Sequence, residues 1–102
     1  IISDGEIERV YNILSDKDIK ITPQPWNQRY REYMDMIKTG KVEEIAKVLR
    51  NLCVLQNEKG LSFGERKIME MAQNLLIQEI AIATKLEKKT IREKITKILG
   101  QN

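Results

Sequence analysis

The stretch from Leu61 to Thr84, LSFGERKIMEMAQNLLIQEIAIAT, decides the fold class. Ser62 and Glu65, three residues apart, have the spacing of a capping box, in which each side chain bonds the backbone N–H of the other residue. Beyond this start, apolar residues recur at helical spacing, at Ile68, Met69, Ala72, Leu75, Leu76 and Ile80. The stretch therefore predicts a long amphipathic helix whose apolar face enters a core.

The same pattern, a polar start followed by apolar residues at helical spacing, recurs along the rest of the chain. It predicts four further helices, at about residues 3–15, 25–38, 42–57 and 87–99. The connector between the first two is too polar and too rich in proline to continue a helix. Because no segment has the pattern of a strand, the sequence predicts an all-α protein, a compact bundle of about five helices.

Residues 1–102 are expected to form a single domain, because 102 residues is close to the commonest domain size. Cys53 is the only cysteine, which excludes an internal disulfide, and its apolar neighbours predict that it is buried. No apolar run reaches the roughly 18 residues that cross a bilayer, and no signal peptide is visible. We therefore expect a cytoplasmic protein without membrane contact. Since the chain begins with Ile1 rather than Met, we also expect an upstream region.

The charge of the chain is unevenly distributed. The net charge is +3, a mild basic excess that is weak support for an anionic partner. Residues 1–20 carry five acidic and three basic side chains, whereas residues 84–102 carry two acidic and six basic ones. A nucleic-acid surface on this protein is therefore expected to be a local patch.

The residues that most often carry enzyme chemistry are missing. There is no histidine, the commonest general acid or base and metal ligand, and a lone cysteine without histidine is a poor nucleophile. The five glycines are dispersed at helix boundaries and form no phosphate-binding loop. We expect no catalytic residue, no metal site and no cofactor, and we do not expect an enzyme.

The first candidate binding site lies in TPQPWNQRYREY, residues 22–33. If a helix begins at Pro25, Trp26 lies in its first turn with Arg29 and Arg31 nearby. An indole that wedges beside bases, together with guanidinium groups that neutralise phosphates, suits nucleic acid. Alternatively, Trp26 packs on Tyr30 and closes the core; the residues alone leave both interpretations open and slightly favour burial. The inner stripe of this helix is expected at Tyr30, Tyr33, Met34 and Ile37.

Two further candidates are basic segments. GERK, residues 64–67, places Arg66 and Lys67 at a helix start, where backbone N–H groups favour an anion. The alternative is a solvated face whose charge is balanced by Glu65 and Glu70. The basic run at residues 85–97 could contact nucleic acid or an acidic partner, although such a run is more often the wet side of an amphipathic helix.

Taken together, these residues resemble the C-terminal helical domain of the CarD/CdnL family of bacterial transcription regulators. The resemblance is carried by PWNQRYREY, IKTGKVEEIAKVLRNL and NEKGLSFGERKIMEMAQNLLIQEIA, which occur in the family's order and spacing. It covers about residues 25–83 and is specific over that length.

The resemblance implies a concrete function. Such proteins join an N-terminal Tudor-like β domain, which binds the RNA polymerase β-subunit lobe, to this helical domain, which contacts promoter DNA at the upstream edge of the transcription bubble. The family's tryptophan, here Trp26, wedges into the minor groove and helps to keep the open complex from closing. The resemblance also implies that basic residues, matching Arg29, Arg31, Arg66 and Lys67, contact the phosphate backbone of the DNA. The expected DNA-binding residues are Trp26, Asn27, Arg29, Arg31, Arg66 and Lys67.

The chain departs from the family in two ways. Relatives often carry a basic residue where this chain has Gln28, which implies weaker phosphate contact here. The β domain is absent from this chain, so it should not recruit polymerase by itself. We expect a monomer that acts at the bacterial nucleoid. The competing hypothesis is a protein–protein adaptor that docks an acidic partner through its basic helices, and it requires Trp26 to be buried.

Overall fold

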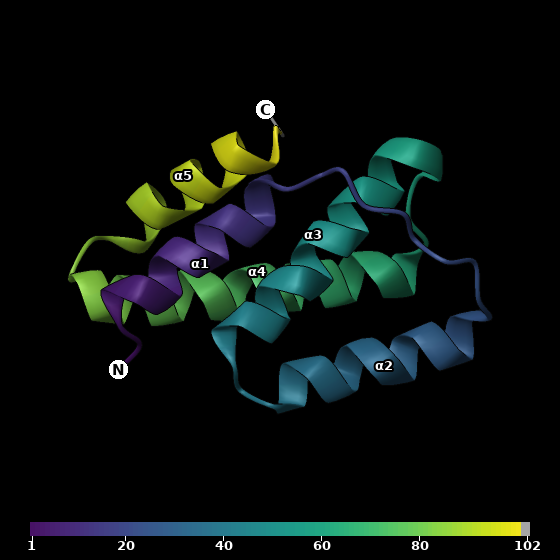
Figure 1. Cartoon of the computed structure of the whole chain (residues 1–102), viewed down its shortest axis with the longest axis horizontal. Coiled ribbons are helices and arrows are strands. Elements are labelled where there is room, and N and C mark those ends of the chain that lie inside the picture. Colours follow the sequence, from purple (N-terminus) through teal and green to yellow (C-terminus); the bar gives the residue numbers. More distant parts are fainter. Residues whose placement is uncertain (101–102) are drawn as a thin grey trace.

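The computed structural model describes residues 1–100 and contains five helices (Figure 1). They are α1 (Asp4–Ser15), α2 (Trp26–Lys38), α3 (Val42–Lys59), α4 (Phe63–Thr84) and α5 (Lys88–Leu99). The predicted all-α class is confirmed, and within these residues there is no strand. The predicted boundaries are close: α3 continues to Lys59 rather than Asn57, and Pro25 is the N-cap of α2 rather than its first helical residue.

Both predicted capping boxes are present. In α1, Ser3 Oγ accepts from the Glu6 N–H at 3.2 Å, and Glu6 Oε1 accepts from the Ser3 N–H at 3.1 Å. In α4, the equivalent distances between Ser62 and Glu65 are 3.2 and 2.9 Å. Such caps satisfy N–H groups that the helix leaves free, and each cap stabilises the fold by about 1 kcal/mol.

Helix α3 lies at the centre of the bundle and packs against α1, α2 and α4. Helix α5 packs on α1 and α4, and α2 also contacts α4. In Figure 1, α1 and α5 lie on one side of α3, and α2 lies on the opposite side. The radius of gyration, 13.1 Å, is that of a compact domain of this length.

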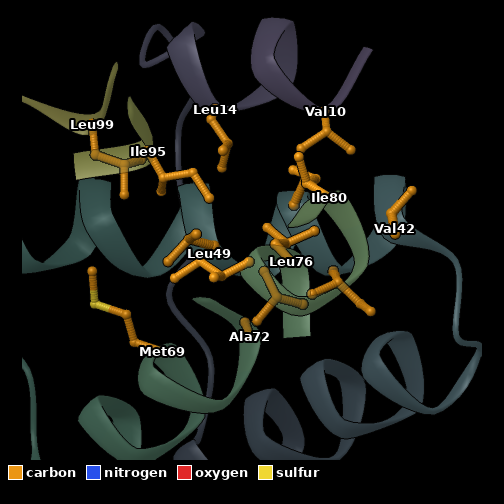
Figure 2. Close-up of a cluster of buried hydrophobic side chains, with 14 of the residues drawn as sticks. Val10, Leu14, Val42, Leu49, Met69, Ala72, Leu76, Ile80, Ile95 and Leu99 are labelled. Carbon is orange, nitrogen blue, oxygen red and sulfur yellow. The ribbon is translucent and has the colours of Figure 1, made fainter. Parts of the chain in front are cut away.

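The core is built from aliphatic side chains of α1, α3, α4 and α5 that point toward one another (Figure 2). It includes Val10, Leu14, Leu49, Ala72, Leu76, Ile80, Ile95 and Leu99, all at most 2% exposed. Cys53 is buried as predicted. Leu75 was expected in the core but is only partly buried, while Ile77 is 1% exposed. Because α4 is covered by α2, α3 and α5, its buried face is wider than a single stripe.

None of the helices between residues 1 and 100 combines the length and the hydropathy needed to cross a membrane.

Candidate nucleic-acid interface

The N-termini of α2 and α4 meet at one end of the bundle. Trp26 is the first residue of α2 and Gly64 the second residue of α4. A Cβ atom added to Gly64 would lie 3.0 Å from Trp26 Cζ2, so the indole rests against the backbone of α4. Glycine allows this close approach, because a methyl group here would require the ring to shift by a few tenths of an ångström.

The Trp26 side chain is neither buried in the core nor fully exposed to solvent. It is 36% exposed, and its ring meets Tyr30 edge-on, with the centroids 5.6 Å apart. Tyr30 is itself 46% exposed, so the two rings do not close the core. The prediction that Tyr30 belongs to the inner stripe of α2 is wrong. The buried residues of this helix are Arg29, Tyr33 and Ile37.

The start of α2, like the starts of α3 and α5, has no side-chain cap. Pro25, its N-cap, makes no side-chain hydrogen bond, and the first turn contains no acidic residue. By contrast, α1 and α4 each begin with a capping box and an acidic residue in the first turn. The free N–H groups and the positive end of the helix dipole therefore favour an anion close to Trp26.

Arg29 is buried, which corrects the expectation that it is free to contact phosphate. It is 5% exposed, and its Nη1 lies 3.4 Å from Glu65 Oε2. Its Nη2 donates to the Thr22 carbonyl at 3.5 Å, while Nε is buried without a hydrogen-bond partner. Arg29 therefore ties α2 to α4 beneath Trp26 instead of facing solvent.

Glu65 is the buried partner of that pair. Burial acts to raise the pKa of its carboxyl, but hydrogen bonds from Ser62 and the charges of Arg29 and Lys59 outweigh it, so the pKa lies below the ordinary 4.5. Because the pKa of Glu65 is lower in the folded than in the unfolded chain, the stabilisation from its ionised carboxylate is present above the ordinary pKa and is lost as the pH falls through the folded-state pKa. Because Glu65 is occupied by these partners, it does not balance the charges of Arg66 and Lys67 at the surface.

Tyr33 lies next to the same buried pair and is 5% exposed. Burial raises the pKa of its phenol, while a hydrogen bond with Asn51 and the charge of Arg29 act in the opposite direction. The phenol therefore stays neutral at physiological pH and adds no negative charge beside Arg29.

The remaining predicted site residues are exposed but do not form one cluster. Asn27 and Arg31 line a groove on the outer face of α2, together with Tyr30. Arg66 lines a different groove, formed with the end of α3 and the middle of α4. Lys67 lies over the ring of Phe63, with Nζ 5.3 Å from the centroid. These exposed cations therefore lie on separate faces, and the grooves that hold Arg31 and Arg66 also contain Asp35 and Glu70.

Two residues of this surface were missed in the sequence. Gly64, which the sequence analysis treated only as part of a basic segment, lies against the Trp26 indole. Phe63 is 69% exposed and lines the same groove as Trp26. The signal for Phe63 was available, because it lies off the apolar stripe that continues through Ile68 and Ala72.

Gly64→Ala is expected to move the indole without unfolding the protein. Alanine favours the helix by about 1 kcal/mol over glycine, which offsets the strain of a contact that Trp26 can relieve by moving outward. The melting temperature should change little, while Trp26 fluorescence shifts to longer wavelength. Gly5→Ala, in the first turn of α1 and with no Trp26 atom near its Cβ, is the matched control. Unchanged Trp26 emission in Gly64→Ala would contradict the contact between the indole and Gly64.

Within residues 1–100, no three His, Cys, Asp or Glu side chains come together as metal ligands would.

The chain is similar to known proteins over most of its length. The family model described as "CarD, C-terminal domain" matches residues 9–96. The Bacillus subtilis (strain 168) protein named "Putative transcription factor YdeB" is 38% identical over 68 residues, which are 67% of this chain and 44% of that protein. The chain therefore spans less than half the length of that relative.

Proposed function

The chain belongs to the CarD C-terminal domain family of transcription regulators, and we propose that it binds promoter DNA at the upstream edge of the transcription bubble. In this proposal Trp26 wedges into the minor groove, and cations around it contact the phosphates. The observation that carries the proposal is the position of the indole. It is partly exposed at an end of the bundle, beside an uncapped helix N-terminus.

An apolar wedge acts best where the duplex is already opening. Inserting a ring beside a base step costs a few kcal/mol of unstacking, and that cost is smallest at the edge of a melted region. The domain would consequently bind open promoter DNA more tightly than closed duplex. A ligand shifts an equilibrium only by such a difference in affinity, so it would stabilise the open complex.

The proposed phosphate contacts come from Arg31, Arg66 and Lys67, with Asn27 beside the wedge. Arg29 leaves this set, because it is paired with Glu65 and joins α2 to α4 next to the groove that holds Trp26. With so few phosphate contacts the isolated domain should bind weakly, and its affinity should fall steeply with salt. Specificity would then come from the bubble edge rather than from base-edge readout.

The partners of the whole protein are part of the proposal. The Bacillus subtilis relative is about twice as long as the matched region, which leaves room for a polymerase-binding domain upstream. In that arrangement the upstream domain recruits RNA polymerase, and this domain acts on the DNA in the bacterial cytoplasm, at the nucleoid. The adaptor hypothesis required a buried Trp26, and the 36% exposure of the indole favours the DNA interface over it.

The proposal is tested by comparing Trp26→Ala and Arg66→Ala on forked promoter DNA and on blunt duplex of the same sequence. Trp26→Ala is expected to lose the preference for the fork, because the wedge is removed. Arg66→Ala should weaken binding to both DNAs and lower the salt slope by about 1, because one phosphate contact is lost. Fluorescence anisotropy at several salt concentrations measures both effects.

Arg9→Ala is the matched control, because Arg9 is an exposed arginine of α1, which lies on the opposite side of α3 from α2 (Figure 1). It should bind both DNAs as the parent chain does. Unchanged binding of both Trp26→Ala and Arg66→Ala would refute the proposal. Trp26 emission that does not respond to DNA would instead favour the adaptor.

A further inference from the structure

Phe63 is an aromatic ring that the core does not use. It is the first residue of α4 and 69% exposed, more than any other large hydrophobic residue at positions 2–100. An isolated exposed leucine or isoleucine is ordinary on a protein surface, so exposure alone would carry no inference. The surroundings of Phe63 make it different.

Phe63 opens into the groove that also holds Trp26. The groove lies between the starts of α2 and α4, and its lining includes both rings, Gly64 between them and Lys59. Phe63 directly precedes Gly64, on which the indole rests, and both aromatic residues line this groove. Two planar apolar surfaces therefore border one open site at the end of the bundle.

Among the residues that line this groove, the accessible charge is positive. Lys67 Nζ lies 5.3 Å from the centre of the Phe63 ring, and Lys59 lines the groove. Glu65 is the acidic residue among those that line it, and its carboxylate is buried and bonded to Ser62 and Arg29. A ligand that fits must offer a flat apolar face together with negative charge.

We propose that Phe63 stacks on an unpaired DNA base next to the step that Trp26 wedges, with Lys67 and Lys59 against the adjacent phosphates. The inference rests on the proposed function, which brings the groove to a point where the strands separate. A nucleotide of a melted strand has the required chemistry, a planar face joined to a phosphate. Stacking of this kind is tolerant of sequence, because every base offers a planar face.

The test uses a fork with unpaired strands at one end, the blunt duplex of the same sequence, and three variants of this chain. Phe63→Ala is expected to bind the fork about five-fold or more weakly, with little change on blunt duplex, because a stacked base is lost. Phe63→Tyr, which keeps a ring, should bind the fork as the parent chain does. Phe63→Leu, which keeps apolar area without a ring, should behave like the alanine variant. Thermal melting checks the fold, which an exposed side chain should not alter.

The outcomes separate this inference from the proposed function. If Phe63→Ala binds the fork normally while Trp26→Ala does not, stacking by Phe63 is refuted and the wedge stands. Equal losses on fork and blunt duplex, or normal fork binding by Phe63→Leu, would also refute stacking. If neither Phe63→Ala nor Trp26→Ala changes binding, both the inference and the proposed function fail.

Discussion

Arg29→Ala is expected to lower the free energy of unfolding by about 3–5 kcal/mol, because it leaves the Glu65 carboxylate buried without its charged partner. The two side chains are 6% and 9% exposed, so the carboxylate left behind would keep only its bonds with Ser62 and the charge of Lys59. Urea unfolding followed by circular dichroism measures the change. Because the pair joins α2 to α4 below Trp26, this variant should also lose fork binding.

The control for this prediction removes both charges. In the double variant Arg29→Met with Glu65→Gln, the glutamine keeps the capping box with Ser62, and most of the lost stability should return. The recovery is expected because the native pair is long, at 3.4 Å, and leaves Arg29 Nε without a partner. The double variant should also lack the acid-induced loss of stability that comes from Glu65. A cost below about 1 kcal/mol for Arg29→Ala would show that the pair does not hold the helices together.

Leu76→Ala is expected to cost about 2–5 kcal/mol of unfolding free energy, since it opens a cavity at the centre of the core. Leu76 is 0% exposed and points into the cluster formed by α1, α3, α4 and α5 (Figure 2). Urea unfolding again provides the measurement. The folded protein should keep its preference for forked DNA, because Leu76 lies in the core and not at the end that carries Trp26.

Ile82→Ala is the matched control on the same helix. Ile82 is 53% exposed, so its truncation should change stability by no more than about 0.5 kcal/mol. If Leu76→Ala cost no more than Ile82→Ala, the assignment of this core would be wrong. Together with Arg29→Ala, these variants separate loss of general stability from loss of the proposed DNA-binding surface.

The helices could be predicted because their signals are local. Capping boxes depend on residues three positions apart, and the apolar stripes depend on spacings of three and four. Both capping boxes and all five helices were found where the sequence places them, with small differences at the ends. Membership of the family was also readable in the sequence, and the match over residues 9–96 confirms it.

The orientation of α2 was predicted less well. The spacing that placed Tyr30 inside has a close competitor, the series Arg29, Tyr33 and Ile37, in which each residue is four positions from the next. Hydrophobicity alone points to the first series, because arginine is almost never fully buried unless it is paired. Arg29 is buried because Glu65 supplies the opposite charge, and that partner is 36 positions away.

The sequence by itself determined the five helices, their capped starts and the family, because each of these depends on neighbouring residues or on a recognisable order of segments. The tertiary structure decided which side chains near Trp26 are exposed at the surface and which are buried. It buried Arg29, exposed Tyr30, seated the indole on Gly64 and placed Phe63 beside it. The reason is that α2 and α4 begin at the same end of the bundle, so burial and charge pairing there are settled between residues far apart in the chain.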